Sequence, residues 1–372
     1  MVIISNLYHF VLIFIQNMSK NILRIYLYIL IVTIGLSSCS NKITNQSNLI
    51  KLDDKVNTDY AEYSAFYDNH SEILYYTTFL GDQDIYVSQK IKNSADTNKY
   101  EFSQPIDINR LMDSNYSDEY YLINTELNDG SPIISYDGNS LYFVGCNRPN
   151  GNGSCDIYVS TKNKQNKWTK AVPLDNNINS RQFESFPSIT KNNQTLYFVS
   201  TRETKYYSDG EDVANNYNIW QSKFNENTQK WDIATIVENV NTDGAETSPF
   251  ISDDGKTLYF SSTNGENHLG GYDIYKSNYN SETNSWSKPI NLGSEINSEQ
   301  DELYFRIDYK NNKGYLTKSS LNSFDNFKLD AKYYLNYIKP IVPYPFTKIL
   351  NFNTYDTYDI YMVDLNKVKI KQ

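Results

Sequence analysis

Residues 248–262, SPFISDDGKTLYFSS, hold two short strand-like runs on either side of a polar turn. The first run is Ser248–Ser252, and Gly255 in the turn can adopt the positive φ that tight turns require. Polar connections then lead to a third apolar run at Tyr272–Ser277 and a fourth at Trp286–Leu292. The segment therefore predicts a meander of four short antiparallel strands.

The same unit recurs five times, marked by Val or Ile, then Asn, then Ser or Thr. An acid follows each Asn by five residues and a Tyr follows it by 18. The Asn residues are Asn57, Asn124, Asn179, Asn241 and Asn297, and the acids are Glu62, Asp129, Glu184, Glu246 and Glu302. The tyrosines are Tyr75, Tyr142, Tyr197, Tyr259 and Tyr315. A repeat of this length indicates one supersecondary unit used many times.

Four-stranded sheets repeated around an axis form a β-propeller, so we predict an all-β fold with four-stranded antiparallel blades. Outer-strand aromatics recur at Trp168, Trp231 and Trp286, with Phe102 in the first unit, and we interpret them as blade packing. Five blades are expected, with an insertion at about 319–357 in the last unit. A sixth blade within that insertion is the alternative.

The two ends of the chain are expected to share a blade. The last unit has strand-like runs near Tyr304–Asp308, Gly314–Thr317 and Tyr358–Val363, but no fourth. The missing phrase lies at Asn48–Leu52, directly before the first Asn motif. We therefore predict that this N-terminal strand completes the last blade and closes the ring.

The N-terminus is typical of an export signal. Lys20 precedes the apolar run Ile22–Leu36, which is too short for a membrane-spanning helix, and Leu36-Ser37-Ser38-Cys39 resembles the lipobox of bacterial lipoproteins. That resemblance implies cleavage before Cys39 and lipid attachment to it. The expected organisation is a signal peptide at 1–38, a lipidated tether at 39–47 and a propeller at 48–372. Met18 is an alternative start, and an unusually long signal is the other explanation for the apolar residues before it.

Phrases such as SPFISDDGKTLYFSS, GGYDIY and WSKPINLGSEINS resemble the WD40-like repeats of TolB-type periplasmic β-propellers. The resemblance covers about residues 48–365. Such repeats also occur in outer-membrane lipoproteins, so it implies an envelope protein. The departures are that no OmpA-like domain follows and that the N-terminal domain of TolB is absent. TolB also has six blades.

The five repeated acids allow two interpretations. They are expected in loops that enter the inner strands, on one rim of the channel, where carboxylates could hold calcium or attract a basic partner segment. The structural alternative is that each acid accepts hydrogen bonds from nearby backbone N–H groups or from the Ser or Thr beside the Asn. A pattern kept in every unit favours the structural alternative, so we predict no metal and no cofactor.

Cys146 and Cys155 flank an eight-residue loop, NRPNGNGS, between two expected neighbouring strands. Export to an oxidising compartment permits a disulfide between them. The alternative is a metal site, for which His70 and His268 are the histidines after the signal. We predict the disulfide.

Composition and motifs argue against catalysis and against nucleic-acid binding. The net charge is −10, whereas phosphate backbones are bound by Lys and Arg. The chain has no HExxH, GxSxG or Walker motif. We therefore expect a non-catalytic, lipid-anchored propeller of the bacterial envelope, on the outer membrane facing the periplasm. It would bind an envelope protein or cell-wall polymer.

The alternative function is a glycan-binding or carbohydrate-active propeller, because glycosidases need only two suitably placed carboxylates. For the interaction function, recognition is expected in the most variable loops, at 108–122, 202–216 and 319–357. The candidate contacts are Tyr206, Tyr207, Tyr333, Tyr334 and Tyr337, because Tyr is enriched in interface cores.

Overall fold

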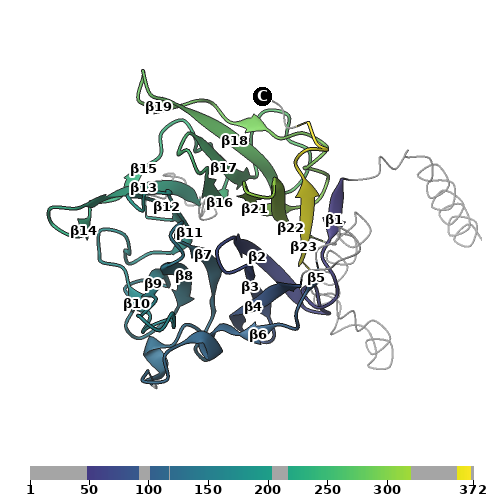
Figure 1. Ribbon diagram of the computed structural model, residues 1–372. Coiled ribbons are helices and arrows are strands. Elements are labelled where there is room, and N and C mark those ends of the chain that lie inside the picture. Colours follow the sequence, from purple (N-terminus) through teal and green to yellow (C-terminus); the bar gives the residue numbers. More distant parts are fainter. Residues whose placement is uncertain (1–47, 92–100, 117, 203–216, 320–357, 370–372) are drawn as a thin grey trace, which may run out of the picture. The chain divides into compact units, whose positions relative to one another are not determined.

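The computed structural model describes residues 48–91, 101–116, 118–202, 217–319 and 358–369. Within the compact unit of residues 48–372, five antiparallel sheets are arranged radially around one axis (Figure 1). The predicted all-β, five-bladed propeller is thereby confirmed. Residues 1–47, and with them Cys39, lie outside the described part of the chain. So do residues 320–357, which hold nearly all of the expected insertion and the proposed sixth blade.

Each blade places its first strand next to the axis and its last strand outside. Blade 1 comprises β2 (Ala61–Asp68), β3 (Ile73–Phe79), β4 (Gln83–Ile91), β5 (Glu101–Phe102) and β6 (Ile106–Asp107). Blade 2 comprises β7 (Asp129–Ile134), β8 (Ser140–Cys146), β9 (Cys155–Thr161) and β10 (Val172–Pro173). Blade 3 comprises β11 (Glu184–Ile189), β12 (Thr195–Ser200), β13 (Asn218–Asn225), β14 (Lys230–Trp231) and β15 (Thr235–Ile236).

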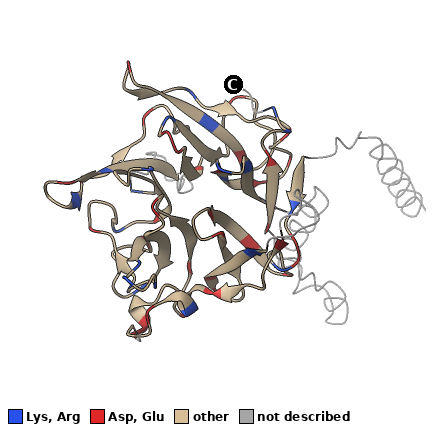
Figure 2. Ribbon diagram, viewed as in Figure 1, with Lys and Arg blue, Asp and Glu red and all other residues tan. Residues whose placement is uncertain are grey.

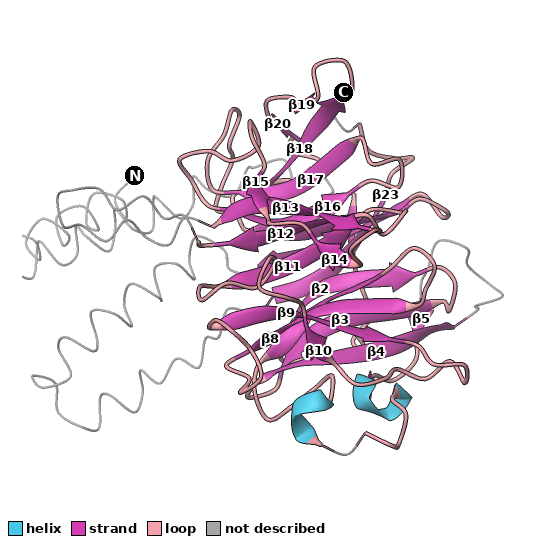
Figure 3. Ribbon diagram, turned by 90° about the vertical axis from the view of Figure 1, so that its left-hand side faces the viewer, coloured by secondary structure: helices cyan, strands magenta, loops and turns pink. Residues whose placement is uncertain are grey.

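Blade 4 comprises β16 (Glu246–Ile251), β17 (Thr257–Ser262), β18 (Asp273–Asn280), β19 (Ser285–Trp286) and β20 (Ile290–Asn291). Blade 5 comprises β21 (Glu302–Asp308), β22 (Lys313–Ser319), β23 (Tyr358–Asp364) and β1 (Leu49–Lys51). Among the described residues the helical elements are two short 3₁₀ turns, η1 (Ile108–Leu111) and η2 (Glu119–Tyr121) (Figure 3). No helix in this part of the chain is long and apolar enough to cross a membrane.

Every inner strand contains a bulge, and those of blades 4 and 5 start two residues earlier than the sequence predicts. In blade 4 the strand was expected from Ser248, but it begins at Glu246, and its register with β17 shifts between Thr247 and Phe250. The residue two positions after each repeated acid has a φ of 53–56°. These residues are Ser64, Ser131, Phe186, Ser248 and Tyr304. A bulge bends a strand and strengthens its twist, so the repetition curves all five inner strands alike around the axis.

The expected fourth strand is split in two. Instead of one strand from Trp286 to Leu292, blade 4 has β19 and β20, which both pair with β18 but in registers that differ by one residue. The interruption contains Pro289, which cannot donate a hydrogen bond to the ladder. Blades 1 and 3 show the same split, so the break in register is part of the repeated blade.

The core lies between neighbouring blades, and the repeated tyrosines and tryptophans supply it. Tyr197 of blade 3 and Trp286 of blade 4 share one buried cluster, with ring centroids 6.1 Å apart. Tyr75 with Trp168, and Tyr142 with Trp231, occupy equivalent clusters at the two preceding interfaces. The aromatic repeat is therefore the packing element that joins each blade to the next.

The N-terminal strand closes the ring, as predicted. Ile50 of β1 pairs with Met362 of β23 in an antiparallel ladder. Leu52 and Val56 are buried with Tyr315 and Ile360 at the interface between blades 5 and 1. The last blade is therefore built from both ends of the described chain.

Candidate functional site

The repeated Asn side chains connect consecutive blades. Each one accepts a hydrogen bond (2.7–2.9 Å) from the N–H of an Ile in the third strand of the preceding blade. Each also donates one (2.9–3.0 Å) to the carbonyl of that same Ile. The pairs are Asn57–Ile360, Asn124–Ile85, Asn179–Ile157, Asn241–Ile219 and Asn297–Ile274. An amide that offers both donor and acceptor is suited to this role, which accounts for the invariant Asn.

The five repeated acids do not form an exposed carboxylate ring. Each lies at or near the start of an inner strand with 0% of its surface accessible, so their expected position in rim loops is wrong. Each accepts a backbone N–H bond (2.7–3.0 Å) from the Ser or Thr beside the Asn. The hydroxyl of the same residue donates a second bond (2.6–2.7 Å). These contacts match the structural interpretation, in which each acid accepts hydrogen bonds from its own turn. Because the five carboxylates are buried, a ligand at the surface does not reach them.

In four of the five blades a further partner reaches the acid from the end of the second strand, 16 residues later. Ser262 donates to Glu246 at 2.8 Å, Ser200 to Glu184 at 2.6 Å and Thr78 to Glu62 at 3.1 Å. In blade 5 the ammonium of Lys318 lies 3.1 Å from Glu302. Burial raises the pKa of Glu62, Glu246 and Glu302, and their hydrogen bonds oppose that shift.

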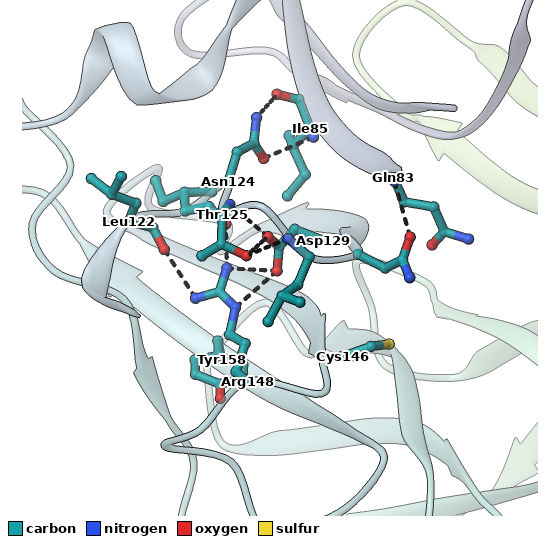
Figure 4. Close-up of polar contacts among 12 residues, drawn as sticks. Gln83, Ile85, Leu122, Asn124, Thr125, Asp129, Cys146, Arg148 and Tyr158 are labelled. Atoms are coloured by element: carbon teal, nitrogen blue, oxygen red, sulfur yellow. Dashed lines mark hydrogen bonds and ion pairs between the residues drawn. The ribbon is translucent and has the colours of Figure 1, made fainter. Parts of the chain in front are cut away.

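Blade 2 replaces this arrangement with a buried ion pair. Its acid is the shorter Asp129, and Gly145 stands where the other blades have Ser, Thr or Lys. Arg148 fills the space: its Nε and Nη2 donate to Asp129 Oδ1 at 2.8 and 2.6 Å (Figure 4). The guanidinium also donates to the carbonyls of Leu122 and Ile123. It lies 4.6 Å from the ring centroid of Tyr158.

Cys146 and Cys155 form a disulfide. They are directly opposite each other in the ladder between β8 and β9, which places the 147–154 loop at the end of the ring where the inner strands begin. Among the described residues, no group of three His, Cys, Asp or Glu side chains is placed to hold a metal ion.

At the end of the ring where the inner strands begin, the structure has a cavity of about 940 Å³, which we call the bowl. Blades 1, 2, 3 and 5 line it, and the disulfide lies in its wall. Its larger side chains are aromatic or aliphatic: Tyr60, Tyr63, Phe79, Leu80, Phe183, Phe186, Tyr304 and Tyr358. A concave, mainly apolar cavity of this kind is the usual form of a binding site.

Aromatic rings from three blades form the floor of the bowl. The ring centroid of Tyr304 in blade 5 is 5.7 Å from that of Tyr63 in blade 1 and 5.5 Å from that of Phe186 in blade 3. Blades 3 and 5 are not neighbours, so the contact between Phe186 and Tyr304 crosses the axis. The floor separates the bowl from a smaller cavity of about 450 Å³ at the opposite mouth of the channel.

The two cavities differ in charge. Among the described residues that line the bowl, Asp59 alone carries a charge. The opposite mouth has five Asp, His or Lys side chains among its described lining: Asp68, His70, Lys191, Asp253 and Lys310. Asp68 there accepts hydrogen bonds from the backbone N–H groups of His70 and Ser71, so it stabilises a turn. Because its lining is mainly apolar and concave, the bowl is the better candidate for recognition. Its described lining has one carboxylate, Asp59, rather than a pair.

A buried arginine lies between the two cavities. Arg306 is 2% exposed; Nη1 donates to the carbonyl of Pro249, while Nε and Nη2 have no hydrogen-bond partner. At the equivalent position the other inner strands carry Phe66, Ile133, Ser188 and Phe250. Burial lowers the pKa of Arg306 to about 10.

Of the three loops chosen as contacts from the sequence, only 108–122 is largely described, and its described residues do not line the bowl; 203–216 and 320–357 lie outside the described part of the chain. The described part of 108–122 forms η1 and η2, and Asp113 there bonds to the backbone of Trp168 in blade 2 rather than lining the bowl. Tyr206, Tyr207, Tyr333, Tyr334 and Tyr337 lie outside the described residues. The floor residues Tyr63, Phe186 and Tyr304 were missed. The sequence signal that could have found them is an aromatic residue at the bulge of the inner strand, where blade 2 has Gly130 and Ser131.

The raised pKa of Asp84 predicts that the stability of the folded protein falls as the pH rises. Burial raises the pKa of Asp84 to about 7, and the nearby carboxylates of Asp82 and Asp107 add to the shift. Because the unfolded chain loses this proton near its ordinary pKa of 3.8, the folded state is favoured most below about pH 4. That advantage is lost as the pH rises through about 7. We expect Asp84→Asn to raise the melting temperature at pH 8 by about 2–4 °C, since Asp84 is partly exposed and water screens it.

The substitution is conservative in this fold, because blade 3 has Asn218 at the equivalent position. Melting curves from pH 4 to 8 test the prediction, with the exposed Glu226→Gln as control. An Asp84→Asn variant whose melting temperature declines with pH as steeply as that of the parent protein would refute it.

Comparison with known proteins finds similarity to solved structures only. No protein-family model and no curated protein matches the chain. The chain resembles a GH43_12 protein from a capybara gut metagenome, with a TM-score of 0.48 and 12% identity over 86% of this chain and 54% of that one. It also resembles the native arabinanase of Bacillus subtilis, with a TM-score of 0.43 and 14% identity over 83% of this chain and 95% of that one.

TolB from Acinetobacter baumannii is similar as well, with a TM-score of 0.37 and 13% identity over 70% of this chain. The chain spans about half the length of that protein, 51%. The five radial sheets make the protein a five-bladed β-propeller, and its structural similarity to these TolB and GH43 proteins is distant.

Proposed function

We propose that this protein is a non-catalytic, lipid-anchored propeller of the bacterial envelope that binds a protein segment in the bowl. The observation that carries the proposal is the bowl itself: about 940 Å³, lined by aromatic and aliphatic side chains and floored by Tyr63, Phe186 and Tyr304. A protruding apolar side chain of a partner would bury its surface there, at about 25 cal/mol for each Å². The anchor rests on Leu36–Cys39, and localisation at the outer membrane follows from the same sequence.

The bowl favours binding over glycan hydrolysis. Glycosidases work with two carboxylates about 5–10 Å apart, whereas Asp59 is the one carboxylate among its described lining residues. Rigid walls from four blades favour recognition, because an ordered site loses little entropy when a partner binds.

Site-specific photocrosslinking in cells tests the proposal. A benzoylphenylalanine at Tyr60 or Leu80, both exposed at the bowl, is expected to capture one envelope protein that the same probe at Tyr309 of the opposite mouth does not capture. The captured protein, once identified and purified, should bind the parent protein and lose at least tenfold affinity for Leu80→Asp. Tyr309→Asp is the matched control and should bind normally.

Two outcomes would overturn the proposal. Crosslinks of equal yield at Tyr309 and Tyr60 would remove the bowl as the binding site. Binding or hydrolysis of a glycan panel that disappears in Leu80→Asp, without a protein partner, would favour the glycan-related alternative. The anchor is tested by Cys39→Ala, which should move the protein from the membrane fraction to the soluble fraction and abolish palmitate labelling.

A further inference from the structure

A ring of exposed acids lies on the same end of the propeller as the bowl. In each unit the residue two positions after the repeated Asn is exposed. Four of the five are acids and one is basic: Asp59, Glu126, Asp243, Glu299 and Arg181. We call these five positions the rim. Asp59 also lines the bowl, so the rim charges and the apolar cavity belong to one surface.

Three bases at this end of the propeller pair with buried acids. Arg148, Arg202 and Lys318 lie at the ends of the second strands, and each forms an ion pair with a fully buried acid of its own blade. Their charges are therefore largely taken up by Asp129, Glu184 and Glu302 and do little to offset the rim. In Figure 2, acidic segments are visible around the ring on connections between strands.

Asp82 adds to the negative field of this end, and Asp84 adds to it once the pH is above about 7. Asp82 and Asp84 flank the start of β4, next to Gln83, which lines the bowl. The pKa of Asp84 is raised by burial and then by neighbouring carboxylates. The groups that shift this pKa are burial and three carboxylates, those of Asp82, Asp107 and Asp129, so like charges gather at this point, as expected for a surface that attracts cations.

We infer that the bowl accepts a cationic segment of a protein partner, in which an aromatic or large aliphatic side chain is flanked by Lys or Arg residues. The inference rests on the proposed function and specifies its partner. The apolar side chain would fill the cavity above Tyr304 and Phe186, while the flanking cations would lie against the rim. Lys and Arg suit this arrangement because their aliphatic stems cover apolar surface and their charged ends stay in water. Tyr60, half exposed beside Asp59, offers a ring for a cation–π contact.

Synthetic peptides of ten residues provide defined probes. The first has a central Trp flanked by two Lys on each side; the others replace the four Lys by Ser, replace them by Glu, or replace the Trp by Ala. Fluorescence anisotropy is measured with the purified chain at 50 and 300 mM salt. The Lys/Trp peptide is expected to bind at least about tenfold more tightly than the Ser/Trp and Lys/Ala peptides at low salt. Its advantage over Ser/Trp should shrink at 300 mM salt, because exposed charges are screened.

Variants of the chain place the effect on the rim. Neutralising the four rim acids (Asp59→Asn, Glu126→Gln, Asp243→Asn and Glu299→Gln) should weaken Lys/Trp binding about tenfold and flatten its salt dependence. The matched control neutralises four exposed acids elsewhere: Glu119→Gln, Glu226→Gln, Asp232→Asn and Glu282→Gln. It should bind like the parent protein. Arg181→Glu, which makes the rim uniformly acidic, should tighten binding several-fold.

The outcomes separate this inference from the proposed function. Equal binding of the Lys/Trp and Ser/Trp peptides, or equal losses in the rim and control variants, would overturn the cationic partner. Failure of every peptide would also overturn it. In each of these cases the proposed function still stands if the probe at Tyr60 captures a partner. Loss of that capture would overturn both.

Discussion

A chain that begins at residue 54 is expected to be far less stable than one that begins at residue 48, although the two differ by only six residues. The shorter chain lacks β1, so the outer edge of β23 loses its ladder partner. It also lacks Leu52, which is 4% exposed at the interface between blades 5 and 1. Burial of one Leu contributes about 1.5–3 kcal/mol, and each lost hydrogen bond roughly 1 kcal/mol. We therefore expect a loss of about 5 kcal/mol or more.

The loss should exceed what the same contacts would cost at the end of an open array. In a solenoid each repeat contacts only its neighbours, so a damaged end frays locally. In a closed ring, blade 5 must contact blade 1, and Asn57 reaches Ile360 only if that interface is formed. An exposed β23 also presents unpaired backbone groups that promote aggregation. Denaturant unfolding of the two chains, followed by fluorescence and circular dichroism, measures the difference.

A point substitution provides a control that leaves the chain length unchanged. Asn57→Ala and Asn241→Ala remove equivalent hydrogen bonds, but only Asn57 acts at the closure. If the closure is the weakest interface, Asn57→Ala should cost more stability. Coincident unfolding curves for the chains that start at 48 and 54 would show that β1 is dispensable, and the explanation of ring closure would be wrong.

The fold was predictable because its information is local and repeated. An Asn, an acid five residues later and a Tyr 18 residues later mark one blade, and five copies predict the ring. The structure shows the physical reason for each position. The Asn forms hydrogen bonds with the preceding blade, and the Tyr packs against the next blade. The acid accepts hydrogen bonds from the Ser or Thr that follows the Asn, and so fixes the turn before the inner strand. The pattern recurs in all five units because every interface between blades uses the same contacts.

The burial of the acids was harder to predict from spacing. A carboxylate near a strand start is equally consistent with an exposed rim and with a buried acceptor. The deciding signals were the Ser or Thr beside each Asn and the Ser or Thr that stands 16 positions after Glu62, Glu184 and Glu246. The residues that are exposed lie three positions before the acids, at Asp59 and its equivalents, and they carry no conspicuous spacing signal of their own.

The bowl could not be predicted because it depends on contacts between distant blades. Tyr63, Phe186 and Tyr304 lie far apart in the sequence; Tyr63 meets Tyr304 only when the ring closes, and Phe186 meets Tyr304 only across the axis. The split of the fourth strand depends in the same way on register, since blade 3 shows it without a proline in the interruption.

Arg148→Ala is expected to destabilise the protein by roughly 3–5 kcal/mol, the cost of leaving one member of a buried ion pair uncompensated. Asp129 would stay fully buried with only Thr125 as its partner. The carbonyls of Leu122 and Ile123 would also lose their donor. Urea unfolding measures the change. The exposed Arg181→Ala, two residues after Asn179, is the control and should change stability by less than about 0.5 kcal/mol.

The effect of substituting Gly145 on stability should depend on whether Arg148 is present. A Cβ at Gly145 would lie 2.5 Å from Arg148 Nε and 2.8 Å from its Cδ, so Gly145→Ser alone should destabilise the protein. Once Arg148 is Ala, that space is empty. The triple variant Asp129→Glu, Gly145→Ser, Arg148→Ala would then reproduce the pair of Glu246 and Ser262. It should regain most of the stability that Arg148→Ala loses. A Gly145→Ser substitution that is equally harmful with and without Arg148 would mean that blade 2 is not an exchangeable version of blade 4.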